Sequence, residues 1–364
     1  MPASIFARLR DHLARFPGDA IPLQIGDTHL APAAALDRVA WNELDAAELY
    51  AYGSPEGWRP LVDALAAKAA SNRIVASARN IQIACGATHA ISCAVQALCD
   101  PGDELIVATP HWPLVRGMAI GFGVTPVEVA FEQLEIAITP RTAAIYFATP
   151  NNPDGTMRTA AELARVVELA TRHRLWILAD EVYEHYGYDA DHVSIAALPG
   201  GAERTVTVFS FAKSYAQAGL RVGYAIAPEP LAAVLKKLVN HSVYNVPVAM
   251  QRAAHVALAD GAAFLASARA TYRGLRDRAR ARLRAPSQRP PGGAYLWVDF
   301  RPWLAGGSNC MPILERCAAA GVLLAPGHAF GVACGAFARL CFTGVTPERL
   351  DEGIDRINAV LAES

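Results

Sequence analysis

The sequence predicts an α/β protein in which a mostly parallel sheet is covered by helices on both faces. Two observations favour this fold class. Short apolar runs of strand length recur between residues 81 and 209. Helical stretches lie between several of these runs, such as the one in which Leu163, Val166, Val167 and Ala170 share one face. Strands that alternate with helices along a chain are typical of parallel sheets, because each crossover helix returns the chain to the same edge.

The predicted elements begin with a helix over residues 58–69. Its apolar residues fall at i, i+3, i+4, i+7, i+8 and i+11, so one face of the helix is buried. The predicted strands of the sheet follow at residues 81–84, 104–108, 143–148, 175–179 and 205–209. Past Pro247 an Ala- and Arg-rich stretch without a strand-like run extends to about Arg284.

The C-terminal third of the chain predicts a second domain. Residues 287–293 (SQRPPGG) break the helical stretch. We expect a strand over 294–299, a helix from about Pro312, short strands around Val322 and Arg339, and a closing helix from Pro347. Since 364 residues allow two or three domains, we expect a large domain over 46–270 and a smaller α+β domain over 271–364. An N-terminal arm over residues 1–45 would complete the smaller one.

Composition excludes several classes of partner. Lys and Arg number 33 and Asp and Glu 34, so the net charge is −1, and no like-charged run could bind nucleic acid or an anionic membrane. The windows 80–99 and 317–338 lack charged residues, but polar residues, proline and glycine interrupt them, so no membrane span is predicted. Seven cysteines without a C-x-x-C pair indicate buried thiols and no metal site. Free thiols are typical of a reducing compartment, and no signal peptide is visible, so we expect a cytoplasmic location.

Scans for common catalytic motifs give one match. The zinc-hydrolase, serine-esterase, P-loop and Rossmann patterns are absent. Ser210-Phe211-Ala212-Lys213 matches the S-x-x-K pattern of penicillin-recognising enzymes, but the companion S-D-N and K-T-G motifs are missing, so acyl transfer is disfavoured.

Lys213 favours a different chemistry. It follows a predicted strand, and α/β proteins bind ligands at such strand ends. Burial lowers the pKa of a lysine amine, which can then form a Schiff base with a carbonyl. Polar segments also follow two other predicted strands, at residues 149–155 (TPNNPDG) and 179–183 (ADEVY), and Arg221 lies eight residues past Lys213.

In these ordered motifs the sequence resembles the class I aminotransferases, enzymes of fold type I that use pyridoxal 5′-phosphate (PLP). The resemblance runs from about Gly26 to Gly344. It implies that Lys213 forms the Schiff base with PLP and that Asp180 pairs with the pyridine nitrogen. An ionised carboxylate keeps that nitrogen protonated, so the ring can accept electrons. Asn152 and Tyr183 match the groups that hydrogen-bond the phenolate oxygen.

The resemblance also implies the remaining contacts of the cofactor. Gly86-Ala87-Thr88 would open a helix directly after a strand and direct backbone amides at the phosphate. Ser210 and Arg221 match the side-chain phosphate ligands. Trp112 stands where the family stacks an aromatic ring on the pyridine. Tyr52 resembles the tyrosine that reaches the phosphate of the neighbouring subunit, which implies a homodimer with shared active sites.

Substrate contacts are implied at fewer positions. Arg339 matches the arginine that holds the α-carboxylate, and Gly26 and Asn152 complete that site. Ala212 and His328 depart from the family pattern with little expected effect on PLP. After Gly26 the family often continues with an acidic residue and a proline, whereas this chain reads Asp27-Thr28-His29. His29 either lines or caps the pocket, or acts with Asp27 on the distal group of the substrate.

The function implied by the resemblance is ping-pong transfer of an α-amino group from an amino acid to a 2-oxo acid. No second arginine motif for a distal carboxylate is evident, so strict aspartate or glutamate specificity is not expected. An alternative keeps the cofactor but acts as a lyase, cyclase or oxidase on an amino acid, such as a polar or arginine-like one. A regulatory module that only retains the PLP pocket is a further alternative. Such regulators usually carry a DNA-binding domain in front of the pocket domain, and only about 20 residues precede the motif region here, so this alternative is disfavoured.

Overall fold

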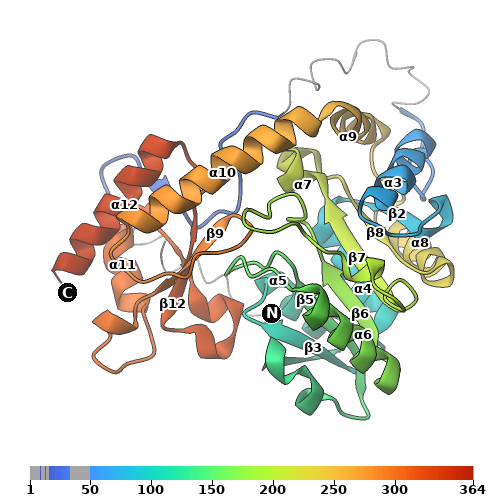
Figure 1. Ribbon diagram of the computed structural model, residues 1–364, viewed down its shortest axis with the longest axis horizontal. Helices are drawn as coiled ribbons and strands as arrows, with labels where there is room; N and C mark the ends of the chain where they lie inside the picture. Colours follow the sequence, from blue (N-terminus) through green and yellow to red (C-terminus); the bar gives the residue numbers. More distant parts are fainter. Residues whose placement is uncertain (1–8, 10–12, 14–15, 33–49, 364) are drawn as a thin grey trace.

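The computed structural model describes residues 9, 13, 16–32 and 50–363. The fold is built around a seven-stranded sheet, several strands of which are labelled in Figure 1. The strand order is β2-β8-β7-β6-β5-β3-β4, and β8 alone runs opposite to the other six strands. The strands are β2 (Ile81–Ala84), β3 (Glu104–Thr109), β4 (Thr125–Ala130), β5 (Thr142–Ala148), β6 (Trp176–Asp180), β7 (Thr205–Ser210) and β8 (Gly223–Ile226). The expected α/β class with a mostly parallel sheet is confirmed.

Helices cover both faces of this sheet. Successive side chains of a strand point to opposite faces, so Tyr146 of β5 packs on one side of the sheet and Phe147 on the other. The Tyr146 side is covered by α4 (Gly86–Leu98), α5 (Pro113–Gly121) and α8 (Glu229–Val243). The opposite side is covered by α3 (Arg59–Ser71), α6 (Ala160–His173) and α9 (Val248–Asp260). The short helix α7 (Phe211–Ser214) continues directly from β7.

Two strands of the sheet were not predicted. β4 is an edge strand whose residues are only partly buried and include Pro126 and Glu128, so it lacks an apolar run. β8 has four residues and begins with Gly223. β4 pairs along its whole length with β3, and β8 pairs with β2 on one side and β7 on the other.

The C-terminal elements form a second group with its own core. They are α10 (Ala262–Arg282), β9 (Tyr295–Asp299), α11 (Met311–Ala319), β10 (Val322–Leu323), β11 (Ala325–Pro326), β12 (Phe337–Cys341) and α12 (Pro347–Ala362). β11, β12 and β9 form an antiparallel sheet. The predicted strands and helices of this region are confirmed, and α10 runs across residue 270, where a domain boundary was expected.

Residues near the N-terminus belong to this second group. β1 (Ile21–Pro22) pairs in parallel with β10, and the amide of Cys341 donates to the carbonyl of Leu23 at 2.8 Å. Ile21 and Leu23 are fully buried in the same core as α10, α11 and α12. Most of the expected N-terminal arm lies outside the described residues, so residues 9, 13 and 16–32 carry this observation, and Leu9 and Leu13 belong to the same core.

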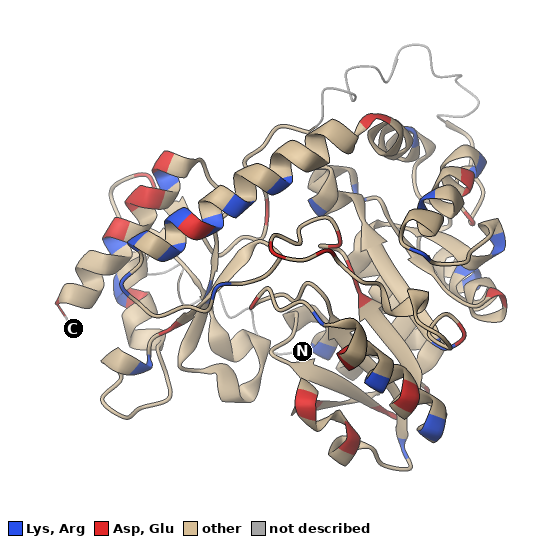
Figure 2. Ribbon diagram, viewed as in Figure 1, with Lys and Arg blue, Asp and Glu red and all other residues tan. Residues whose placement is uncertain are grey.

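Charged residues are distributed over both groups with the two signs mixed (Figure 2). Along α10 and α12 they pair across the helices: Arg278 lies 2.5 Å from Asp351 and Arg282 lies 2.5 Å from Asp355. None of the helices in the described residues combines the length and apolar character needed to cross a membrane.

Candidate active site

A cavity of about 220 Å³ lies between the two groups, at the carboxyl ends of β5, β6 and β7. Parallel strands all present this edge to the same side, which is where α/β folds bind ligands. The residues expected at the site that line this cavity are Gly26, Ala87, Thr88, Trp112, Asn152, Asp180, Tyr183, Ser210, Lys213, Arg221 and Arg339. In the described part of the chain, no cluster of His, Cys, Asp or Glu is arranged to hold a metal ion.

Asp180 provides a buried carboxylate at the end of β6. One of its oxygens accepts from the amide of Val182 at 3.3 Å and the other from the hydroxyl of Tyr146 at 3.2 Å. Burial raises the pKa of Asp180 to about 6. A cationic nitrogen placed in the cavity would offset that burial and favour the ionised carboxylate.

Lys213 lies on α7, one turn beyond the end of β7. Its ammonium group donates to the carbonyl oxygen of Gly26, and its own carbonyl accepts from the hydroxyl of Tyr186 at 3.0 Å. Burial lowers the pKa of Lys213, which favours the neutral, nucleophilic amine. The side chain of Ser210 caps α7 by accepting from the amide of Ala212 at 3.1 Å.

The N-terminus of α4 and Arg221 form a cradle for an anion. α4 begins at Gly86, which has a φ of +73°, and its first turn contains no acidic residue. Nη1 of Arg221 donates to the carbonyl of Ala218 at 2.7 Å, which fixes the guanidinium beside Gly86. Free amides at a helix start and an arginine side chain suit a phosphate group.

Replacing Gly86 with Ala tests whether the cradle holds the phosphate of the PLP expected from the sequence, and should then weaken PLP binding by at least about tenfold. A Cβ at this position would collide with Nη2 of Arg221, and the positive φ would strain any side chain, so both halves of the cradle would move. Titration of Trp fluorescence with PLP measures the dissociation constant. Gly219→Ala is the matched control, because a Cβ there meets nothing within 4 Å. Equal PLP affinities for the two variants would contradict the expected contact.

Arg339 brings a buried guanidinium to the other side of the cavity. Its guanidinium carbon lies over the rings of Tyr295 and Phe330, 4.3 and 5.0 Å from their centroids. Nη1 donates to Oδ1 of Asn152 at 2.7 Å and Nη2 to the carbonyl of Gln24 at 2.6 Å, while the buried Nε has no hydrogen-bond partner. A buried donor without a partner indicates space for an acceptor such as a carboxylate.

Tyr295 was missed by the sequence analysis. It is the first residue of β9, and its hydroxyl lies 2.5 Å from the hydroxyl of Tyr183. The same hydroxyl occupies the space that a Cβ on Gly26 would fill, so a side chain at Gly26 would collide with it. An aromatic residue that opens a strand after a Pro/Gly break was the available signal, but only the tertiary structure shows which residues it faces.

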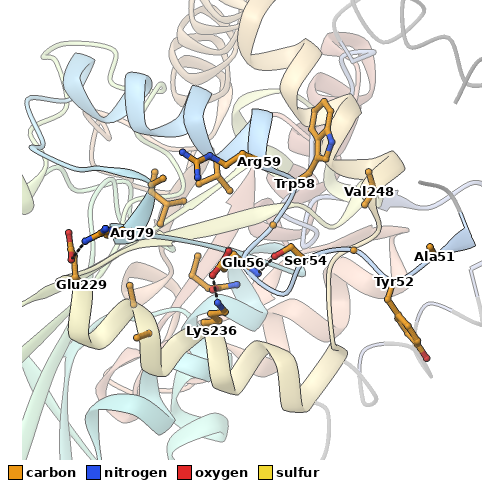
Figure 3. Close-up of a pocket in the computed structure, with 18 residues that line it drawn as sticks. Ala51, Tyr52, Ser54, Glu56, Trp58, Arg59, Arg79, Glu229, Lys236 and Val248 are labelled. Carbon is orange, nitrogen blue, oxygen red and sulfur yellow. Dashed lines mark hydrogen bonds and ion pairs between the residues drawn. The ribbon is translucent and has the colours of Figure 1, made fainter. Parts of the chain in front are cut away.

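Four expected site residues do not line this cavity: Gly86, which lies beside Arg221 at the start of α4, and Tyr52, Asp27 and His29. Tyr52 is 82% exposed, packs against the ring of Tyr244 and lines a separate hollow of about 740 Å³. In Figure 3 its ring points away from Glu56 and Lys236, which form an ion pair within that hollow. Asp27 lines a small cavity beside Lys213. His29 lines none of the cavities that contain Gly26 or Lys213.

The ring of His29 binds the backbone instead. Its Nδ1 lies 2.9 Å from the carbonyl oxygen of Thr343, which also accepts from the amide of His29 at 2.8 Å. Because a carbonyl only accepts, Nδ1 must carry the proton in this arrangement. The contact ties the loop after Gly26 to the end of β12, as a capping residue would.

Comparisons with known proteins agree with this geometry. The family described as "Aminotransferase class I and II" matches residues 19–357. The chain belongs to this family. It is 34% identical over 358 residues to the arginine–pyruvate transaminase AruH of Pseudomonas aeruginosa, covering 94% of this chain and 90% of that protein. It is 32% identical to a probable aspartate/prephenate aminotransferase of Thermus aquaticus, covering 77% and 76% of the two chains.

Solved structures of aminotransferases share the fold. The aspartate aminotransferase of Thermus thermophilus with maleate superposes with a TM-score of 0.90 at 29% identity, covering 99% of this chain and 97% of that one. The N-succinyldiaminopimelate aminotransferase of Mycobacterium tuberculosis gives a TM-score of 0.89 at 28% identity, covering 98% and 97%. The protein is therefore a PLP-dependent aminotransferase of fold type I, as the sequence predicted. Nothing in the comparisons favours a lyase, cyclase or oxidase.

The cavity of this aminotransferase fits PLP on its own chemistry. A buried lysine amine, a buried carboxylate and an anion cradle line one space, each suited to a different part of the cofactor. The partnerless Nε of Arg339 adds a place for a substrate carboxylate in the same cavity.

Proposed function

We propose that the 220 Å³ cavity is the active site and that its residues divide the work of transamination. PLP, when bound, supplies a ring that accepts electrons from the bonds of the substrate Cα. The observation that carries the proposal is the convergence of Lys213, Asp180 and Arg339 on one cavity. Asn152 and Tyr183 would hydrogen-bond the phenolate oxygen, and Trp112 would cover the ring. The start of α4 (Gly86, Ala87 and Thr88), with Ser210 and Arg221, would hold the phosphate.

Lys213 would attach the cofactor and then act as the general base. Burial favours its neutral amine, so Nζ can accept the proton of the substrate Cα near neutral pH. The backbone of Lys213 is held by Tyr186, which also donates to the carbonyl of Ser214 at 3.1 Å. These contacts keep the amine near the position where the proton must be taken up and released.

Transamination is tested by a half-reaction. The PLP-loaded enzyme is mixed with an amino acid in the absence of any 2-oxo acid. We expect one equivalent of pyridoxamine phosphate and one of the oxo acid to form per site, and a later addition of 2-oxo acid to restore PLP. Release of ammonia or consumption of O₂ in place of pyridoxamine phosphate would contradict the assignment.

We propose that the preferred amino donor carries a cationic side chain. The carboxylate of Asp27 lies on the loop after Gly26, accepts from the amide of Thr28 at 2.9 Å and shares a small cavity with Lys213. The similarity to an arginine–pyruvate transaminase supports this choice. His29 would assist by fixing the loop through its contact with Thr343.

The Asp27→Asn variant is expected to raise KM for arginine by about 3- to 10-fold, because a partly exposed ion pair is lost. The amide keeps the shape and the acceptor oxygen of the aspartate, and KM for alanine should stay unchanged. Steady-state kinetics with both donors at saturating pyruvate give the comparison. An equal effect on the two donors would show that Asp27 shapes the loop and does not recognise charge.

We also propose a homodimer in which Tyr52 of a second subunit completes each phosphate site. The exposure of Tyr52 and its position beside a 740 Å³ hollow support a role outside its own cavity. Light scattering of the purified enzyme reports the oligomeric state.

We propose a large domain of residues 46–270 and a smaller domain of residues 271–364, which the N-terminal residues 1–45 complete. A cytoplasmic location is supported by seven free cysteines, six of them buried.

A further inference from the structure

A buried tyrosine lies directly behind the carboxylate of Asp180. Tyr146 is fully buried on β5, and its hydroxyl lies 3.2 Å from Oδ2 of Asp180. In the sheet Ala148 is opposite Asp180 and Tyr146 is opposite Leu178. The backbone of Tyr146 therefore lies two residues before the level of Asp180, and its side chain points to the same face of the sheet. Its ring spans that distance and delivers the hydroxyl to the carboxylate. Neither the sequence motifs nor the proposed roles above include this residue.

The hydroxyl of Tyr146 acts as a donor in this contact. Burial, and then the charge of Asp180, raise the pKa of Tyr146 well above its ordinary value, so the phenol keeps its proton at any pH at which the enzyme works. The carboxylate of Asp180 therefore has one donor on each oxygen, Val182 N–H on Oδ1 and Tyr146 O–H on Oδ2. Since each carboxylate oxygen has two acceptor sites, one site on each oxygen is still available for the cavity.

We propose that Tyr146 is a positioning residue that keeps the carboxylate of Asp180 charged and oriented toward the ring nitrogen of the cofactor. This inference rests on the proposed role of Asp180. A hydrogen bond to the ionised form stabilises that form, and two donors from the protein fix the plane of the carboxylate before any ligand arrives.

The groups around Asp180 determine how its ionisation responds to pH. Burial and the neighbouring carboxylate of Glu181 raise the pKa of Asp180, whereas the Val182 amide, the Tyr146 hydroxyl and the charge of Lys213 lower it. Tyr295 also lies within electrostatic range, and burial keeps its phenol neutral by raising its pKa. With Tyr146 replaced by Phe, one of the groups that lower the pKa of Asp180 is lost, so its pKa moves upward from about 6.

The test compares cofactor affinity at two pH values. Pyridoxamine 5′-phosphate is the probe, because it carries the same ring and phosphate but forms no covalent bond with Lys213. In the Tyr146→Phe variant Asp180 becomes protonated at a higher pH, and protonated Asp180 cannot pair with a cationic ring nitrogen. With a shift of about one pH unit, the ratio of the variant and wild-type dissociation constants should be about fivefold larger at pH 6 than at pH 8.5.

Two controls separate this role from a structural one. Tyr224→Phe removes a buried hydroxyl from β8 on the opposite face of the same sheet. The ratio of its dissociation constant for the probe to that of the wild type should be the same at both pH values. The thermal midpoint of each cofactor-free variant reports any loss of stability, which would weaken binding equally at both pH values. A Tyr146→Phe ratio that is the same at pH 6 and pH 8.5 overturns the inference.

The Asp180→Asn variant distinguishes the two proposals. If it binds the probe as tightly as the wild type at both pH values, the proposed role of Asp180 is wrong and the role of Tyr146 has no basis. If Asp180→Asn weakens binding while the Tyr146→Phe ratio stays flat, only the role of Tyr146 is wrong. In the double variant Tyr146→Phe/Asp180→Asn we expect no pH-dependent loss beyond that of Asp180→Asn alone, because the tyrosine acts through the carboxylate.

Discussion

The Lys213→Ala variant should lose transaminase activity by at least about 10⁴-fold in kcat/KM, because one side chain both attaches the cofactor and moves the Cα proton. No other lysine lines the cavity in the described part of the chain, so no neighbouring amine can take its place. Stopped-time assays with arginine and pyruvate, followed by chromatography of the oxo acid, give the rate. Borohydride treatment of the wild-type enzyme with PLP should fix the cofactor on the peptide that contains Lys213, as seen by mass spectrometry.

Two further variants make this result specific. Lys213→Arg keeps a positive charge but cannot form the bond to PLP or act as a base near neutral pH, so it should be as inactive as Lys213→Ala. Lys236→Ala removes a lysine that is 43% exposed and paired with Glu56, away from the cavity, and should retain wild-type activity. A cofactor label on any lysine other than Lys213 would refute the assignment.

The second large effect is expected at Arg339. Arg339→Lys should lower kcat/KM for amino acids by about 10²- to 10³-fold, mostly through KM, because a lysine cannot make two parallel hydrogen bonds to a carboxylate. The guanidinium of Arg339 lies over the rings of Tyr295 and Phe330, and a compact ammonium group would lose much of that contact. PLP affinity should change less than KM, since Arg339 contacts Asn152 among the proposed ring contacts but is not one of the proposed phosphate ligands.

The carboxylate itself provides the control for Arg339. Amines that lack the α-carboxylate cannot form the paired contact with Arg339. They should therefore react slowly with the wild type and equally slowly with Arg339→Lys. Arg301→Lys, an exposed arginine paired with Asp299 in the same sheet region, should leave the kinetics unchanged. A loss in Arg339→Lys of the same size for substrates with and without a carboxylate would show a general distortion of the site.

The sheet could be predicted from the sequence where a strand carries its own apolar run. β2, β3, β5, β6 and β7 lie within one or two residues of their predicted ranges, because each is buried on both faces and has few polar residues. β4 and β8 could not be predicted in this way. One is a half-exposed edge with a proline, and the other begins with Gly223, which weakens its strand pattern although its remaining residues are apolar.

The site was predictable to the extent that the chemistry follows strand ends. Asp180, Ser210 and Lys213 lie directly at the ends of β6 and β7, so the topology alone brings them together. The contact of Tyr146 with Asp180 could not be predicted, because a tyrosine within an apolar run has the pattern of an ordinary core residue. Its partner is 34 residues away, and only the register of β5 against β6 shows the contact. Loop residues such as His29 were predicted to be near the site. Where the side chain of such a residue points depends on backbone contacts, and these leave no pattern in the sequence.

The pairing of β1 with β10 also affects how the chain is made. Ile21 meets Val322 across about 300 residues, so the apolar side chains near the start of the chain have no partner until the distant segment has left the ribosome. At about 5–20 residues per second that interval is roughly 15–60 s. During this time Ile21 and Leu23, fully buried in the finished protein, are exposed to water and to other nascent chains. The early segment therefore stays without its partner strand through most of the synthesis of the chain.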